Sequence, residues 1–179
     1  MNLATKLTML RIVMIPLFMI FVLADIPYGK LIAAAIFVLA SVTDAADGYI
    51  ARKRQEVTNL GKLLDPLADK LLVAAALISL VEIGLIPSWI AVVIIGREFL
   101  VTGLRGVAAA EGVVIAASNP AKLKTIFQIV ALTMLLLDEY FLALTGFSPG
   151  VWVLYLALIF TIYTGFDYVL KTFAQIKMT

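Results

Sequence analysis

Residues Leu31–Ile50, LIAAAIFVLASVTDAADGYI, give the first indication of how this chain folds. It is apolar for most of its length, carries two aspartates near its end, and leads into a charged break at residues 52–62. A second apolar run, Leu63–Val81, follows and has two more aspartates near its start. Because roughly 20 mostly apolar residues let a helix cross a bilayer, this stretch predicts two membrane helices with acidic residues at their joined ends.

The composition of the whole chain indicates a membrane protein. Of its 179 residues, 63% are hydrophobic and 15% are charged, and the mean hydropathy is +1.08, whereas soluble domains are about 45–50% apolar and about 25% charged. Cysteine and histidine are absent, so disulfides, thiolate metal sites and imidazole bases are excluded. Any metal binding or proton transfer must therefore use carboxylates. The net charge of +2 reflects membrane topology and does not indicate a nucleic-acid partner.

Apolar runs of nearly spanning length recur along the chain and are separated by turn residues or charged residues. They predict an all-α protein, one membrane domain over residues 1–179, with six transmembrane helices. The runs are Leu7–Leu23, Leu31–Ile50, Leu63–Val81, Ser88–Ala110, Leu123–Leu137 and Val151–Leu170. Apart from the charged break, the runs are separated by residues 27–29, 84–87, 118–120 and 146–150, which contain Gly, Pro, Ser or Asn.

The basic residues set the expected orientation. Lysine and arginine are disfavoured beside translocated segments, so the side that carries most of them faces the cytoplasm. With six spans, only Lys30 lies on one side, and the other thirteen of the fourteen basic residues lie on the opposite side. We therefore expect a multi-pass protein with both termini and a polar cavity facing the cytoplasm.

The four aspartates are expected to converge. Asp44 and Asp47 are three residues apart, and Asp65 and Asp69 are four apart, so each pair shares one helix face. Clustered carboxylates in a membrane repel one another and attract hard divalent cations, here magnesium, manganese or calcium. The competing interpretation is that these acids only form ion pairs at the membrane interface, with the neighbouring bases Arg52, Lys53, Lys62 and Lys70.

The pattern Asp44-x2-Asp47-Gly48-x2-Ala51-Arg52-x8-Gly61-x3-Asp65-x3-Asp69 resembles the signature of the CDP-alcohol phosphotransferase family at all eight fixed positions. The resemblance covers essentially the whole chain. It implies a homodimer with six membrane helices, in which a cytoplasm-facing cavity brings a CDP-linked donor to an alcohol acceptor. It also implies two divalent ions, Mg²⁺ or Mn²⁺.

The resemblance assigns roles to the residues of the pattern. Asp69 becomes the base for the acceptor hydroxyl and lies beside the metal. The other three aspartates become metal ligands and, with the remaining residues of the pattern, contact the CDP-lipid: Asp44, Asp47, Gly48, Ala51, Arg52, Gly61 and Asp65.

Three further stretches concern the acceptor: residues 2–16, 96–105 and 113–125. They resemble bacterial members of the family that join CDP-diacylglycerol to sn-glycerol 3-phosphate, which implies a place in the bacterial cell membrane. A phosphorylated acceptor needs additional cations, and the candidates flank the same membrane side. These candidates are Arg97, Arg105, Lys122 and Lys124.

Other functions stay open. The acceptor cations also fit the positive-inside rule without any ligand. Within the family, the acceptor could be phosphatidylglycerol, inositol phosphate or serine. A divalent-cation channel or transporter would also place aspartates in a membrane, although a pore predicts acids along a path and these lie near one face.

Overall fold

The structure is a computed structural model that describes residues 3–24, 26–54, 59–112 and 119–176. At the ends of several helices it describes the backbone but not the side chains. All the regular secondary structure of the described residues is α-helical. Six helices are long and one is short. Those helices are α1 (Leu3–Leu23), α2 (Gly29–Arg54), α3 (Asn59–Glu82), α4 (Ser88–Ala110), α5 (Asn119–Leu136), α6 (Asp138–Thr145) and α7 (Pro149–Ile176).

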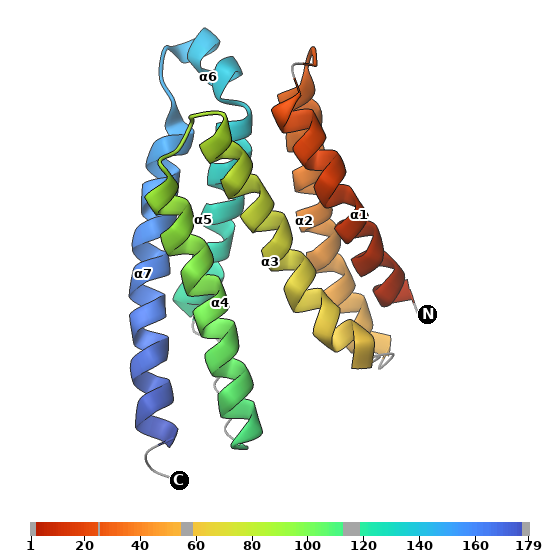
Figure 1. The fold of residues 1–179 in the computed structure, drawn as a ribbon, viewed down its shortest axis with the longest axis vertical. Helices are drawn as coiled ribbons and strands as arrows, with labels where there is room; N and C mark the ends of the chain where they lie inside the picture. The colour runs from red at the N-terminus through yellow and green to blue at the C-terminus, as the bar shows by residue number, and fades with distance from the viewer. Residues whose placement is uncertain (1–2, 25, 55–58, 113–118, 177–179) are drawn as a thin grey trace.

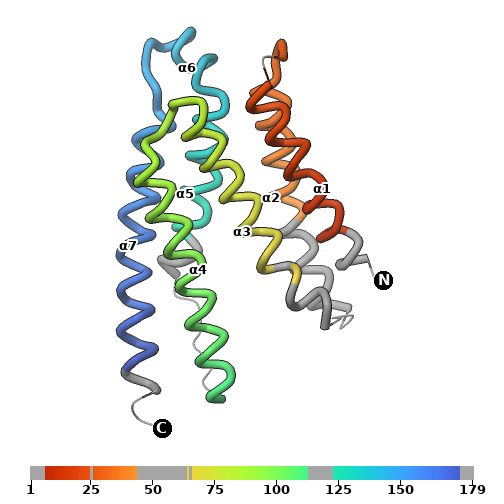
Figure 2. Tube along the Cα trace, viewed as in Figure 1, coloured from red at the N-terminus to blue at the C-terminus, as the bar shows by residue number. Residues whose placement is uncertain are grey.

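The long helices run alternately up and down (Figure 1). The coloured parts of the tube in Figure 2 show successive long helices running in opposite directions, and in Figure 1 α1 begins and α7 ends towards the lower end of the bundle. An even number of long helices produces this arrangement. The predicted topology requires such an arrangement, and the topology itself stays a prediction.

The six long helices coincide with the six predicted runs, but most of them extend further. α2 continues to Arg54 and α3 begins at Asn59, so both helices extend into the charged break. Arginine, lysine and glutamate are good helix formers, and therefore the end of an apolar run is not the end of a helix. α6 was not predicted, and its first turn contains Asp138 and Glu139, which favour a helix N-terminus.

The helices form two packed groups (Figure 1). In the first group α1 packs closely against both α2 and α3, with the rings of Phe18 and Phe37 6.0 Å apart. In the second group α7 packs against α5 and α4, and the rings of Phe127 and Phe160 stack at 5.4 Å. Contacts of α3 with α4 and of α2 with α5 join the groups around a core of buried aliphatic residues.

The sequence predicts α2 and α3 to be antiparallel neighbours. They are antiparallel, but within the described residues they contact each other only slightly, because α1 packs against both of them. A short connection fixes the direction of the second helix without fixing which helix it packs on.

The turn between α1 and α2 is tight. The amide of Gly29 donates to the carbonyl of Ile26 at 2.8 Å, and a Cβ at position 29 would lie 2.6 Å from the carbonyl oxygen of Phe21. Only glycine fits such a contact with backbone. The turn predicted at residues 27–29 is therefore confirmed.

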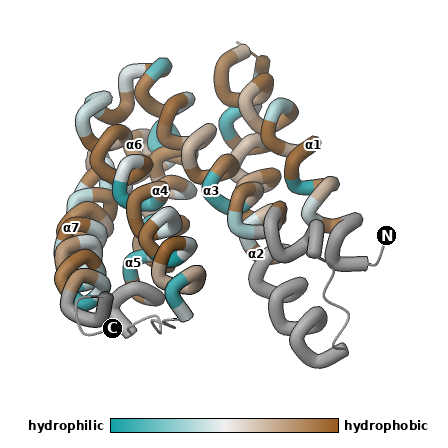
Figure 3. Tube along the Cα trace, turned by 60° about the horizontal axis from the view of Figure 1, so that its bottom comes forward, coloured by the Kyte–Doolittle hydropathy of each residue, from teal (hydrophilic) through white to brown (hydrophobic). Residues whose placement is uncertain are grey.

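Hydrophobic residues make up most of the coloured length of the long helices (Figure 3). Within the described residues, Pro149–Phe173 is the one helix long and apolar enough to cross a membrane, and Leu123–Leu136 with Asp138–Thr145 would make a second, broken span bent by 71°. Leu7–Leu23 and Gly29–Thr43 are apolar but shorter. Large side chains on the outside are widely exposed, including Val92 and Phe166 at 68% and 69%. This exterior suits lipid better than water.

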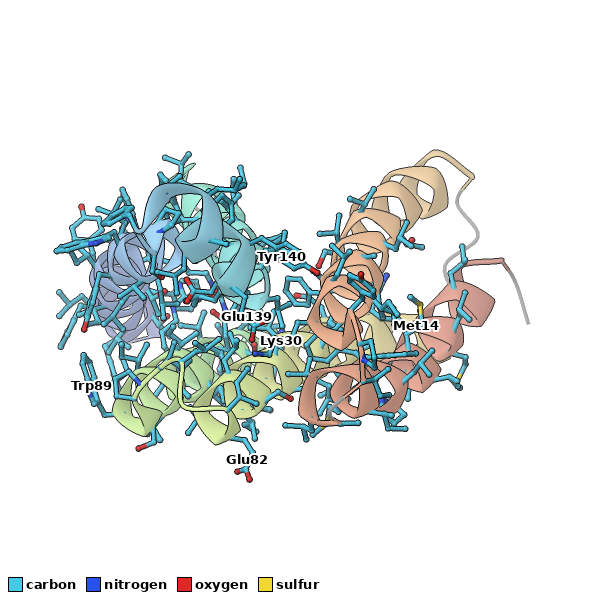
Figure 4. All side chains as sticks on the ribbon, turned by 90° about the horizontal axis from the view of Figure 1, so that it is seen from above. Met14, Lys30, Glu82, Trp89, Glu139 and Tyr140 are labelled. Carbon is cyan, nitrogen blue, oxygen red and sulfur yellow. The ribbon has the colours of Figure 1, made fainter. Side chains whose placement is uncertain are left out.

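The upper end of the bundle is held by an ion pair between Lys30 of α2 and Glu139 of α6, seen from above in Figure 4. Lys30 is the basic residue that the sequence places alone on its side. Trp89, at the start of α4, points outward in the same view and is half exposed. An outward aromatic ring near a helix end suits a membrane interface.

Close packing of α5 on α7 depends on Gly150, since a Cβ there would lie 2.9 Å from both the backbone nitrogen and Cγ of Leu135. We expect Gly150→Ala to lower the free energy of unfolding by about 1–3 kcal/mol, the usual cost of overpacking. Reversible unfolding in mixed detergent micelles, followed by circular dichroism, measures this. Gly103→Ala on α4 is the control because nothing lies within 4 Å of its Cβ position; equal stability of the two variants would contradict the prediction.

Candidate active site

Asp69 lies on α3 and is half-buried, in a cavity lined by residues of both helix groups. It lines a cavity of about 150 Å³ to which four helices contribute. The lining residues are Ser41 of α2; Asp69, Lys70 and Val73 of α3; Glu98 of α4; and Lys124, Thr125, Gln128 and Ile129 of α5.

The rest of the aspartate pattern lies where only the backbone is described. Asp44 and Asp47 are in the last turns of α2, and Asp65 is one turn before Asp69 on α3. The described side chains include no group of three or more metal-ligating residues. Convergence of the four carboxylates therefore stays a prediction, as do the roles of the pattern residues whose side chains lie outside the described part: Asp44, Asp47, Gly48, Ala51, Arg52, Gly61 and Asp65.

Glu98 holds two cations beside the cavity. Its Oε1 forms an ion pair with Nζ of Lys124 and accepts a hydrogen bond from Nη1 of Arg97 at 3.3 Å. The three side chains are largely buried, with Lys124 only 5% exposed. Buried charges are tolerated when they are paired and hydrogen-bonded, and this group keeps a net charge of +1.

Arg97 is also anchored to α7. Its Nη2 donates to Oγ1 of Thr164 at 3.0 Å, and its side chain passes over Gly165, where a Cβ would lie 3.1 Å from Cγ of Arg97. The arginine is therefore fixed between α4 and α7. It acts on the cavity through Glu98, since it does not itself line the wall.

The structure separates the four predicted acceptor cations. Lys124 lines the cavity with Asp69, and Arg97 is joined to it by Glu98. Arg105 is exposed near the end of α4 and does not line this cavity, and the side chain of Lys122 lies outside the described part.

Two cavity residues were missed by sequence reasoning. Glu98 is not among the candidates that the sequence predicts, although a carboxylate beside Arg97 in an apolar run already indicates a buried pair. Gln128 follows Lys124 by four residues, so the two share a helix face inside an apolar run. That spacing was the available signal.

The cavity combines a proton acceptor with a cation. The charges of Glu98, Arg97 and Asp69 all act on the ammonium of Lys124. If the anionic end of a small molecule binds near Lys124, the rest of the molecule lies in the same cavity as the carboxylate of Asp69. The site is therefore suited to deprotonating a hydroxyl on a molecule that carries an anionic group.

Comparison with known proteins identifies the class of protein. The CDP-alcohol phosphatidyltransferase family matches residues 1–163, and the chain belongs to that family, as its aspartate pattern predicted. It is 47% identical to "CDP-diacylglycerol--glycerol-3-phosphate 3-phosphatidyltransferase" of Bacillus subtilis (strain 168), over 98% of this chain and 97% of the relative.

Two further relatives agree. The enzyme of the same name from Rickettsia bellii is 41% identical over 93% of each chain. A "Probable phosphatidylglycerophosphate synthase" of Mycobacterium tuberculosis (strain H37Rv) is 39% identical over 98% of this chain and 83% of the relative.

Proposed function

We propose that this chain transfers the phosphatidyl group of CDP-diacylglycerol to sn-glycerol 3-phosphate, yielding phosphatidylglycerol phosphate and CMP. The acceptor hydroxyl forms a new bond to the phosphorus that carries the lipid, and the bond from that phosphorus to CMP breaks. The observation that carries the proposal is the joint placement of Asp69 and Lys124 in one cavity, in a chain that matches relatives named for this reaction along their length.

In this reaction Asp69 accepts the proton of the attacking hydroxyl, and Lys124, supported by Arg97 through Glu98, holds the phosphate of the acceptor. The carboxylates of the pattern are a donor set suited to Mg²⁺ or Mn²⁺. When bound, such ions supply charge neutralisation at the pyrophosphate. Asp44, Asp47 and Asp65 would hold them, with Asp69 beside them.

The test is an acceptor panel. Purified protein is incubated with CDP-diacylglycerol, Mg²⁺ or Mn²⁺ and one candidate alcohol at a time, and the lipid product is identified by mass spectrometry. We expect phosphatidylglycerol phosphate from sn-glycerol 3-phosphate and little product from phosphatidylglycerol, inositol phosphate or serine. A preference for one of the latter would replace the acceptor, and metal flux into sealed vesicles without any lipid product would favour a transporter.

We further propose six membrane spans in the bacterial cell membrane, with both termini and the cavity on the cytoplasmic side. The alternating course of the helices and the distribution of basic residues support this topology. A homodimer surrounded by membrane lipids is proposed from the family resemblance alone.

Single cysteines test the topology, because the chain has no native cysteine. We expect Leu144→Cys and Glu82→Cys, both exposed at the upper end, to react with an impermeant thiol reagent in intact cells. Glu111→Cys, exposed beyond the lower end of α4, should react only after permeabilisation. The opposite labelling pattern would invert the orientation, and labelling of all three in intact cells would contradict the span count.

A further inference from the structure

Gln128 is a buried polar residue that neither the family pattern nor the chemistry above uses. It lies on α5 one turn beyond Lys124, lines the cavity, and is 2% exposed. Its Nε2 is buried and has no hydrogen-bond partner among the described residues. A buried amide nitrogen without a hydrogen-bond partner is energetically unfavourable. Such a group at the wall of a cavity indicates a ligand that completes its hydrogen bonds.

The other polar residues of the cavity indicate which part of a ligand this is. Lys124 and Gln128 are separated by four residues on one helix, a rise of about 6 Å along the axis. Glu98 and Asp69 complete the charged wall, and Ser41 faces the same cavity with its hydroxyl donated to the carbonyl of Phe37 at 2.8 Å. The oxygen of Ser41 is left as an acceptor. An anion at Lys124 would thus place its next polar group near the amide of Gln128.

We propose that Gln128 binds the acceptor hydroxyl that does not react, and so selects polyol phosphates over simple alkanol phosphates. This inference rests on the proposed function. It identifies the unreactive hydroxyl as a group by which the same site recognises its acceptor. In sn-glycerol 3-phosphate this group is the middle hydroxyl, a few bonds from the phosphate. The side-chain amide can donate from nitrogen or accept at oxygen, so it can hydrogen-bond a hydroxyl in either direction.

The test compares two acceptors with the purified full-length protein and CDP-diacylglycerol: sn-glycerol 3-phosphate and 3-hydroxypropyl phosphate, which lacks only the middle hydroxyl. We expect the original protein to prefer the former by about 10–100-fold in kcat/KM, the scale of a lost buried hydrogen bond. In Gln128→Leu this preference should fall to nearly 1, because use of sn-glycerol 3-phosphate declines while use of the analogue is retained.

Gln128→Met, which keeps the length of the side chain, repeats the measurement if the leucine variant folds poorly. Thr133→Val is the matched control. It also replaces a polar side chain of α5, but Thr133 donates to the carbonyl of Ile129 on its own helix and does not line the cavity. Its acceptor preference should equal that of the original protein.

The outcomes separate this inference from the proposed function. If sn-glycerol 3-phosphate is used but the preference for the middle hydroxyl survives in both Gln128 variants, or is absent from the start, the role of Gln128 is wrong and the function stands. If the original protein makes no product from sn-glycerol 3-phosphate, the proposed function fails and this inference fails with it.

Discussion

Asp69→Asn is expected to lower the turnover number by about 10²–10⁴-fold, the usual worth of a general base. The asparagine keeps the shape and one oxygen of the side chain but cannot accept the proton of the acceptor hydroxyl. Among the pattern aspartates, Asp69 is the one whose side chain is described, and it lines the cavity. The chain has no histidine to replace it. Steady-state assays with saturating substrates measure the loss.

The comparison with Asp44→Asn makes this prediction specific. Asp44 is proposed to hold the divalent ion that neutralises the pyrophosphate, so its loss should weaken binding of the CDP donor, measured by titration calorimetry with CDP and Mg²⁺. Asp69→Asn should largely retain that binding. If Asp69→Asn turned over normally, or lost donor binding as completely as Asp44→Asn, Asp69 would be a metal ligand or a structural acid.

Some elements of the fold followed directly from the sequence. α4 begins and ends at the residues of its predicted run, because Pro87 precedes its start and Gly112 follows its end. α6 could not be predicted in the same way, since eight mixed residues have neither the length nor the apolar character that identifies a membrane helix. α6 is bent by 71° from α5 and is linked to α2 by the ion pair from Lys30, a contact between segments far apart in the chain.

The sequence predicted the part of the site that depends on spacing within one helix, but not the part that depends on packing between helices. Spacing along one helix places Asp69 one turn beyond Asp65, and that relation holds on α3. Which cation lies near Asp69 depends on how the helices pack against one another. The spacing of residues along the chain does not specify this packing. Arg97, Arg105 and Lys124 are all candidates in the sequence. Only the packing of α5 on α2 and α3, together with the ion pair to Glu98 of α4, brings Lys124 to the cavity.

Lys124→Met should reduce kcat/KM for sn-glycerol 3-phosphate by about 10–100-fold, matching the 1.5–3 kcal/mol of a hydrogen bond to a charged group. Methionine keeps the length of the buried side chain, and Arg97 still neutralises Glu98, so the fold should persist. Binding of the CDP donor should change little. Lys171→Met is the control, because Lys171 is 56% exposed and pairs only with Asp167 of its own helix among the described residues.

Arg105→Ala in the same assay tests where the acceptor phosphate lies. Arg105 is exposed near the end of α4, outside the cavity wall, so its contribution should be smaller than that of Lys124. Water and salt screen an exposed charge. Its removal therefore weakens ligand binding less than the removal of a buried charge that contacts the ligand. If Arg105→Ala raised the KM for sn-glycerol 3-phosphate more than Lys124→Met, the phosphate would bind towards the end of α4. The ion pair of Lys124 with Glu98 would then only link α5 to α4.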